Sequence, residues 1–293
     1  AVAAASGIGA SAAALIARRG AKRGASSGGA AGALALAARI GGGAALAGLV
    51  GGAALVGFAA LSRSRAQAAV PADGRFVRVN GKRVHYRDVG SGPTIVMIHG
   101  LAGQMRNFSY ALLDKLASDH RVILIDRPGS GYSDPIDSAT IRSQAAHIGD
   151  ALQTLGLDRP LVVGHSLGGA VALALALDRP DQVGGLALLA PLTHPMDEVS
   201  EAFDGLAIAS PTARLAVAWT LATPMMMLRG EKGAQAAFAP EPVPGDFATR
   251  GGGALLARPG NFQAASADLN AAPADLPSMV ARYPSLEMPV SVL

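Results

Sequence analysis

The chain contains no cysteine, which excludes disulfides, zinc sites with thiolate ligands and a cysteine nucleophile. Charged side chains make up only 16% of its 293 residues, and hydrophobic residues make up 50%. An ordinary soluble domain has about 25% charged residues. This composition excludes an extended disordered chain as the general description. At roughly 100 to 200 residues per domain, the length allows one large domain or two small ones.

Acidic side chains are absent from residues 1–70, which contain seven Lys and Arg residues. The remainder contains 18 basic and 21 acidic side chains, so the pI of about 9.8 reflects a basic N-terminal arm. We therefore expect no nucleic-acid partner for the body of the protein. The arm consists almost entirely of Ala, Gly, Ser, Leu and Arg, and this low complexity indicates that it lies outside any globular core.

Residues 40–61 form an uncharged run of 22 residues with basic residues on both sides. That length spans a bilayer as a helix, so the favoured interpretation is a single-pass membrane anchor, although 14 of the 22 residues are Gly or Ala. A cleaved signal sequence, with Ala66-Gln67-Ala68 as its site and a secreted or periplasmic product, is one alternative. A disordered or mistranslated extension is another, because the first residue is Ala rather than Met.

A domain of alternating strands and helices is predicted from residue 71 onward. Phe76–Asn80 and Lys82–Val89 form a predicted hairpin, because Asn80-Gly81 tolerates the positive φ of a tight turn. Apolar runs that are typical of buried parallel strands follow at 94–99, 121–126, 161–165 and 185–190. Segments with helical apolar spacing lie between them, at 104–118, 138–155 and 167–178. This alternation predicts an α/β fold with a mostly parallel sheet and helices on both faces.

The strand–helix alternation stops after Pro191, which predicts three divisions of the body. Residues 71–192 form the core, 193–283 form a helical lid or cap insertion, and 284–293 return to a core strand at Met288–Leu293. Because the chain stops there in the middle of an expected strand–helix repeat, we expect it to be truncated at its C-terminus.

Ser166 lies in Gly164-His165-Ser166-Leu167-Gly168, between a predicted strand and a predicted helix. A sharp turn in this context holds the serine in strained backbone geometry that small neighbours permit, and lifts Oγ clear of the sheet. The helix N-terminus offers N–H groups and a positive dipole to a developing oxyanion. This pattern predicts a nucleophilic serine.

Residues 75–293 resemble the α/β-hydrolase fold family, in its serine-nucleophile, esterase- and lipase-like group. The resemblance rests on His99-Gly100-Leu101-Ala102-Gly103, on Asp126 to Ser133 (DRPGSGYS) and on the Gly164–Gly168 motif. It implies Ser166 as nucleophile and the N–H groups of Leu101 and Leu167 as the oxyanion hole. It also implies a supporting loop that consists of His99, Gly100, Gly164, His165 and Gly168. Ser166 in place of Asp, and Ala102 in place of a common Pro, argue against dehalogenases and epoxide hydrolases.

The general base and its acid partner are not identified in the sequence. Only His194 follows Ser166, at the start of the predicted lid, and the resemblance implies that both missing groups lie beyond Leu293. Asp197 remains an alternative acid, whereas its neighbours Glu198 and Glu201 are expected to form a solvated helix start. His165 is expected beneath the Ser166 turn. The remaining candidates are expected to be a half-exposed His85, surface residues His120 and His147, and lid residues Trp219 and Met225–Met227 that form either core or an acyl pocket.

The combined interpretation is a serine hydrolase that forms an acyl-enzyme on a small hydrophobic or lipid-like ester, without a cofactor or metal. We expect it to be membrane-anchored through its N-terminal segment. The alternative is a catalytically silent fragment or interaction module, because the triad acid and histidine are missing, and the 293-residue chain itself is predicted to be inactive.

Overall fold

The computed structural model describes residues 27–110, 112–196 and 201–293. The chain divides into two compact units, residues 1–57 and 58–293. The division falls inside helix α2 (Ser27–Ala69), which ends where the sequence predicts the end of the arm. The unit boundary therefore lies earlier in the chain than the predicted domain boundary at residue 70.

The predicted transmembrane helix at 40–61 is not supported. These residues are helical within α2, yet in the described part of the chain no helix combines the length and the apolar character needed to cross a bilayer. The physical reason is composition, because Gly and Ala fill 14 of the 22 positions and contribute little apolar surface.

The last turns of α2 and the residue after it contribute to the interior of the second unit. Ala59 and Val70 are fully buried. The Tyr132 hydroxyl donates a hydrogen bond to the backbone oxygen of Val70. The sequence assigned all of residues 1–70 to an arm outside the core, so this short stretch is an exception to that expectation.

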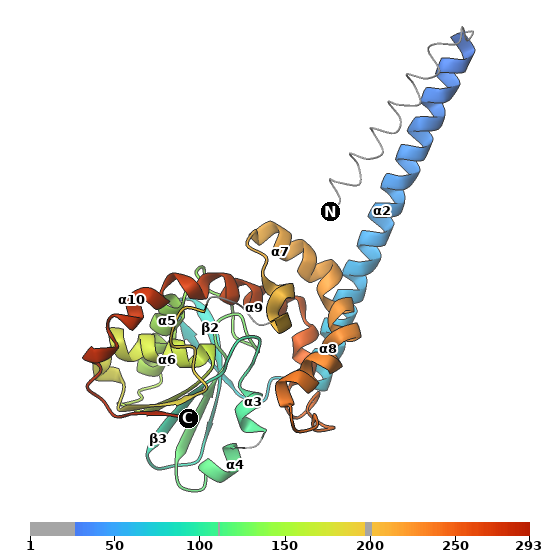
Figure 1. Ribbon diagram of the computed structural model, residues 1–293. Helices are drawn as coiled ribbons and strands as arrows, with labels where there is room; N and C mark the ends of the chain where they lie inside the picture. Colours follow the sequence, from blue (N-terminus) through green and yellow to red (C-terminus); the bar gives the residue numbers. More distant parts are fainter. Residues whose placement is uncertain (1–26, 111, 197–200) are drawn as a thin grey trace. The chain divides into compact units, whose positions relative to one another are not determined.

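The body is built on one seven-stranded sheet (Figure 1) in the order β1-β2-β4-β3-β5-β6-β7. The first two strands are antiparallel and joined by the predicted turn, where Asn80 has φ 50° and Gly81 has φ 79°. From β4 to β7 all neighbours are parallel, which confirms a mostly parallel sheet. The strands are β1 (Arg75–Val79), β2 (Lys82–Val89), β3 (Thr94–Ile98), β4 (Arg121–Ile125), β5 (Leu161–His165), β6 (Gly185–Leu189) and β7 (Val290–Val292).

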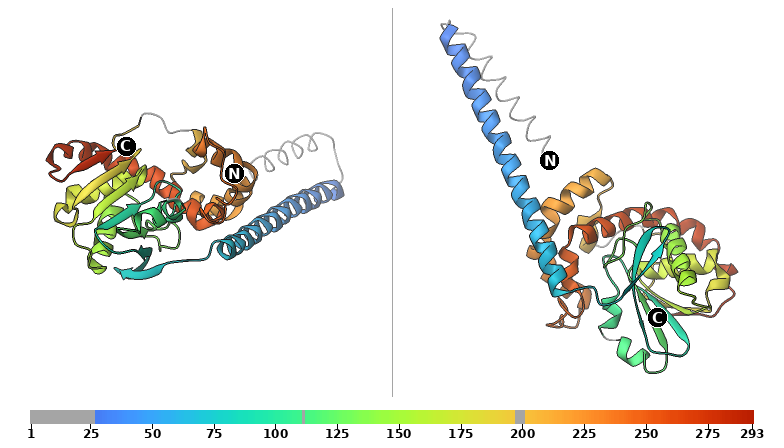
Figure 2. Two further views of the ribbon diagram at one scale, coloured as in Figure 1. Left: turned by 90° about the horizontal axis from the view of Figure 1, so that it is seen from below. Right: turned by 180° about the vertical axis from the view of Figure 1, so that it is seen from behind.

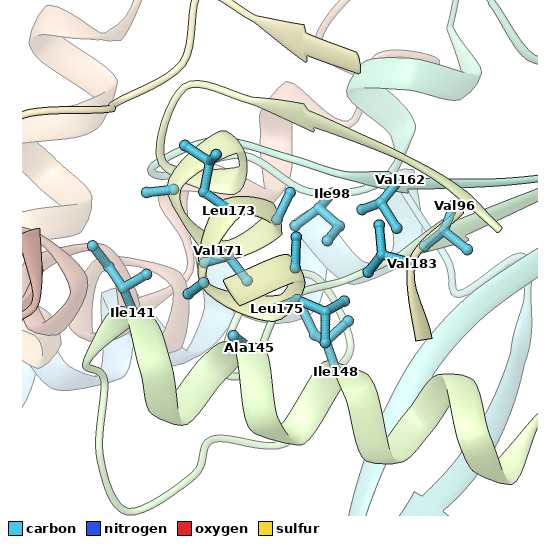
Figure 3. Close-up of a cluster of buried hydrophobic side chains, with 14 of the residues drawn as sticks. Val96, Ile98, Ile141, Ala145, Ile148, Val162, Val171, Leu173, Leu175 and Val183 are labelled. Carbon is cyan, nitrogen blue, oxygen red and sulfur yellow. The ribbon is translucent and has the colours of Figure 1, made fainter. Parts of the chain in front are cut away.

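Both faces of the sheet are covered. Successive side chains of a strand point to opposite faces, and neighbouring strand residues belong to different buried clusters. Ile98 and Ile123 belong to one buried cluster, while Met97 and Leu124 belong to another. The first cluster packs against α5 (Ile141–Thr154) and α6 (Leu167–Asp178). Figure 3 shows α6 side chains between those of α5 and those of the strands. Each large side chain buried in this way contributes about 1.5–3 kcal/mol relative to exposure.

The second face is covered by two short helices where the sequence predicts one long helix. They are α3 (Arg106–Ser109) and α4 (Leu113–Leu116). Phe108 and Leu113 are both buried in the second cluster. A continuous helix turns by about 100° per residue and would direct two side chains five residues apart to different sides. The interruption lets both reach the sheet.

The predicted insertion at 193–283 contains helices and no strand among its described residues. Its elements are η2 (Glu201–Leu206), α7 (Pro211–Val217), a π-helical segment (Ala218–Ala222), α8 (Thr223–Phe238), η4 (Gly253–Ala257), α9 (Pro259–Ala271), η5 (Ala272–Ala274) and α10 (Leu276–Val280). Helices α7 and α9 pack together, and both contact the π-helical segment, which α8 also contacts (Figure 2).

The last part of this insertion packs into the main hydrophobic core instead of forming part of a separate lid. Leu276 and Met279 belong to the main buried cluster, and α10 contacts α6. After η6 (Tyr283–Ser285) the chain enters β7, which pairs in parallel with β6. The expectation that this strand is buried is wrong, because Val290 is 41% and Val292 64% exposed. In the described sheet β7 is an edge strand.

Candidate active site

The sheet order brings three loops to one edge. Strands β4, β3 and β5 are parallel neighbours, so the loops at their carboxyl ends emerge side by side. These loops begin at Asp126, His99 and Ser166. The strand order reverses at β3, and the crevice beyond such a reversal is where open α/β sheets bind ligands.

Ser166 occupies the strained turn between β5 and α6, with φ 52° and ψ −121°. Its N–H donates to the Leu189 oxygen at 3.0 Å, and its own carbonyl oxygen accepts from Gly169 N–H at 2.9 Å and Leu192 N–H at 3.0 Å. A non-glycine residue at positive φ persists only where its surroundings over-determine it. These backbone hydrogen bonds fix the serine at the edge of the sheet.

Glycines make this turn possible through close backbone contacts. A Cβ at Gly164 would lie 2.5 Å from the Gly168 oxygen, and a Cβ at Gly168 would lie 2.2 Å from the Ile98 oxygen. At Gly100 a Cβ would lie 3.1 Å from Ser166 Cβ. The loop after β3 and the turn after β5 therefore approach each other so closely that side chains at these positions would separate them.

The backbone N–H groups of Leu101 and Leu167, beside Ser166, are among those that donate to no protein acceptor within the described ranges. Leu167 is the first residue of α6, so its N–H has no intrahelical partner and carries the positive end of the helix dipole. These are the two donors that the sequence assigned to an oxyanion hole, and they lie on the two adjacent loops.

His99 lies at the start of the loop after β3, holds this loop from the interior and is 1% exposed. Its Nε2 accepts the backbone N–H of Arg127 at 2.9 Å, so Nδ1 carries the proton and donates to the Gly100 oxygen at 2.9 Å. Burial, and secondarily the Arg127 charge, lower the pKa of His99 from 6.5 to about 3. His99 is thus a neutral hydrogen-bonding group in the neutral pH range.

A second buried histidine ties the loops together, and sequence analysis did not assign it to the site. His85 Nδ1 lies 2.6 Å from Asp126 Oδ2, and the Asp126 carboxylate also accepts the N–H groups of Met105 at 2.8 Å and Tyr132 at 2.9 Å. Burial, the largest single effect, raises the pKa of Asp126, but the His85 hydrogen bond, the charges of His85 and His99 and the Met105 N–H together outweigh it, so the net shift is downward. The carboxylate therefore joins the loop after β3 to the loop after β4.

Several expectations about the other histidines are wrong. His85 is 1% exposed rather than half-exposed, and His147 is 6% exposed rather than on the surface. His165 is exposed at the end of β5 rather than packed beneath the turn. It lies beside Gly100, where a Cβ would be 3.0 Å from its Nδ1, and desolvation lowers its pKa.

All six histidines lie in the described ranges, and none of their ring nitrogens hydrogen-bonds to Ser166. His194 is exposed, its Nδ1 lies 2.9 Å from Thr193 Oγ1, and its ring packs edge-on to Tyr283. The alternative acid Asp197 and its neighbour Glu198 lie outside the described residues, and Glu201 begins η2. The structure does not bring the predicted nucleophile together with a base.

Sequence analysis left two roles open for the lid residues Trp219 and Met225–Met227, core packing or an acyl pocket. Trp219 is half-buried in the π-helical segment. Met225 is 45% and Met227 65% exposed on α8. The outward position of these two methionines does not fit the core-packing alternative.

Comparisons with known proteins show which family model, relatives and solved structures this chain is similar to. A family model for the alpha/beta hydrolase fold matches residues 93–221. The chain is 38% identical over 128 residues to 2-hydroxy-6-oxononadienedioate/2-hydroxy-6-oxononatrienedioate hydrolase 1 of Dechloromonas aromatica, with 40% of this chain and 44% of that protein covered. It is also 38% identical over 120 residues to the dihydrolipoyllysine-residue acetyltransferase component of the acetoin cleaving system of Cupriavidus necator, with 40% and 32% covered.

The chain spans less than half the length of these curated relatives. Among solved structures, it is similar to an alpha/beta hydrolase fold protein from Burkholderia ambifaria, with a TM-score of 0.61 and 22% identity over 74% of this chain and 78% of that chain. The sheet order, the strained Ser166 turn and these matches lead to one conclusion. The chain has the alpha/beta hydrolase fold, and its residues 93–221 match the model of that family.

Proposed function

We propose that the protein is a serine hydrolase in which Ser166 Oγ attacks a substrate carbonyl carbon and forms an acyl-enzyme. The observation that carries this proposal is the strained Ser166 backbone, flanked by the two free N–H groups of Leu101 and Leu167. Donors placed where negative charge develops are the largest contribution to catalysis in many acyl-transfer enzymes.

The reaction proceeds in two steps. As the Oγ–C bond forms, the serine proton passes to a base, and the carbonyl oxygen becomes an oxyanion that the two N–H groups stabilise. Collapse of this intermediate expels the alcohol and leaves the acyl group on Oγ. Water then hydrolyses the acyl-enzyme by the same route in reverse. Because no described histidine contacts Ser166, the experiment below supplies the base from solution.

We propose carboxylic esters of small hydrophobic or lipid-like acids as substrates. Leu101 and Leu192 pack against the buried cluster that contains Leu167, the residue after Ser166, and the Leu192 N–H donates to the Ser166 oxygen. These side chains give the site an apolar character. The relative from Dechloromonas aromatica is named a hydrolase, which supports hydrolysis as the reaction type. Residue Ala102 has φ 56°, which proline cannot adopt. This loop therefore differs in conformation from one with proline at this position, the residue that the sequence analysis associates with epoxide hydrolases.

A fluorophosphonate probe tests the proposal, with covalent labelling followed by intact-mass measurement in the presence and absence of imidazole. We expect slow labelling that imidazole accelerates and that Ser166→Ala abolishes. Ser118→Ala, at an exposed position after α4, is the matched control and should label like the wild type.

Two results would contradict the proposal. Equal labelling of wild type and Ser166→Ala would remove Ser166 from its role. No Ser166-dependent labelling, even with imidazole, would favour the catalytically silent interaction module.

A further inference from the structure

The donor at Leu101 belongs to a peptide plane whose opposite edge is occupied by two hydrogen bonds. The Gly100 oxygen accepts from His99 Nδ1 at 2.9 Å and from Arg127 Nη2 at 2.8 Å. In a planar trans peptide, the C=O of one residue and the N–H of the next point in opposite directions. Holding the Gly100 oxygen from the interior therefore fixes the direction of the Leu101 N–H.

Arg127 also binds the loop after β3 through further hydrogen bonds. Its Nε donates to the His99 oxygen at 2.8 Å, and its backbone N–H donates to His99 Nε2 at 2.9 Å. With the bond to the Gly100 oxygen, Arg127 contacts the loop at three acceptors. A charged donor also polarises the peptide it binds, which strengthens the N–H at the other edge.

Helix α9 holds the other end of the same guanidinium. Arg127 Nη1 donates to Asp268 Oδ2 at 2.8 Å and to Gln144 Oε1 at 2.6 Å. Gln144 Nε2 completes the network by donating to Asp268 Oδ1 at 3.0 Å. The side chains of Arg127 and Asp268 are 0% and 3% exposed, so water does not replace either partner.

We propose that Arg127 is a positioning residue that aims the Leu101 N–H at the oxyanion, and that Asp268 on α9 keeps Arg127 in place. This inference rests on the proposed function of Ser166. It gives the predicted lid segment a direct role in positioning the loop after β3, through Asp268, which lies 141 residues after Arg127. The segment 126–133 thus contributes the charged side chain of Arg127, which holds the loop after β3, as well as a turn.

A purely structural ion pair is the competing explanation, because a buried pair can be retained without any contribution to catalysis. The two explanations differ for the double variant Arg127→Met/Asp268→Asn. It removes both charges, so no unpaired charge remains buried, yet it still lacks the donor to the Gly100 oxygen. A structural pair predicts recovery in this variant, and a positioning residue predicts none.

The experiment measures Ser166 labelling by the fluorophosphonate with imidazole, resolved into a maximal rate and a half-saturating concentration. We expect the maximal rate to fall about 10-fold in Asp268→Asn and about 100-fold in both Arg127→Met and the double variant, near the loss of one oxyanion donor. The half-saturating concentration should change less than about twofold. Arg121→Met is the control, because Arg121 pairs with Asp88 at the opposite end of β4.

The double variant decides the outcome, and it remains informative if Arg127→Met alone fails to fold. A double variant that labels at the wild-type rate would overturn the proposal. A wild-type chain that does not label at all would instead contradict the proposed function. In that case the amide resonance of Leu101 still tests the positioning: we expect it to shift in Asp268→Asn and not in Arg121→Met, and an unchanged resonance would overturn the inference.

Discussion

The two sides of Ser166 are organised differently. On the side of the proposed oxyanion donors, the loop after β3 is held by His99, Arg127 and Asp126, all of which are buried and hydrogen-bonded. On the side where a base would act, the described histidine that follows in sequence, His194, is exposed and bonded to its neighbour Thr193.

This difference separates two requirements of catalysis. The proposed oxyanion donors are backbone groups, so their placement follows from the strand order and from the glycines that allow the two loops to approach. A base is a side chain whose position depends on a separate loop and a separate hydrogen-bond partner. Under the proposed function, the backbone therefore supplies charge stabilisation at Ser166, while no described histidine is in contact with it.

The largest expected effect concerns the side that lacks a base. We predict that the 293-residue chain hydrolyses p-nitrophenyl esters about 10⁴ to 10⁶-fold more slowly than serine hydrolases with a complete triad, because loss of a triad member costs this much. Turnover is measured at equal concentrations of soluble protein, and imidazole should increase it. His194→Ala should leave the rate unchanged. Fast hydrolysis that this variant loses would place the base at His194.

The next effect concerns the close approach of the two loops. Gly168→Ala should destabilise the protein by about 3 kcal/mol or more, because the new Cβ would lie 2.2 Å from the Ile98 oxygen, and overpacking next to backbone cannot relax. Gly233→Ala, in α8 with open space around it, should instead stabilise by about 0.5–1 kcal/mol. Urea unfolding measures both. Similar effects of the two substitutions would mean that the loops are not in contact.

The third prediction concerns the backbone conformation of the loop after β3. Ala102 has φ 56°, so Ala102→Pro forces a different loop path and should reduce Ser166 labelling about 100-fold, the loss expected for one oxyanion donor. Ala102→Gly, which accepts positive φ without strain, is the matched control and should label at the wild-type rate. Equal labelling of the two variants would show that the loop conformation is irrelevant to Ser166.

The smallest effect is a pH dependence of stability. The pKa of His99 falls from 6.5 to about 3 on folding, because the ring is buried beside Arg127. Between these values the unfolded chain binds a proton that the folded protein does not, so His99 lowers stability as pH decreases from about 6.5 to about 3. His99→Gln removes this titrating group. The slope of the unfolding free energy against pH in this range should therefore decrease by the amount that corresponds to up to about one bound proton. An unchanged slope would mean that His99 titrates normally.

Local patterns predicted the parts of the site that depend on neighbouring residues. The Asn80-Gly81 turn, the parallel strands and the strained Ser166 turn are all encoded by residues that are adjacent in sequence. The network of Arg127, Asp268 and Gln144 was not predicted, because Arg127 and Asp268 are 141 residues apart and the residues around them do not indicate that they pair.

His85 illustrates why the burial of polar residues is difficult to predict. Its alternation with Val84 and Tyr86 indicated a half-exposed strand. In the structure β2 pairs with β4, so His85 lies next to the end of β4 and meets Asp126. The pairing of these two strands was not apparent from either segment alone. Only knowledge of the strand order would have moved His85 to the interior.

The most direct test of the account is a crystal structure of the fluorophosphonate adduct. We predict phosphorus bonded to Ser166 Oγ, with the phosphoryl oxygen about 2.7–3.1 Å from the nitrogens of both Leu101 and Leu167. A phosphoryl oxygen directed away from these two N–H groups, or an adduct on another residue, would contradict the assignment of the oxyanion hole and of Ser166 as the nucleophile.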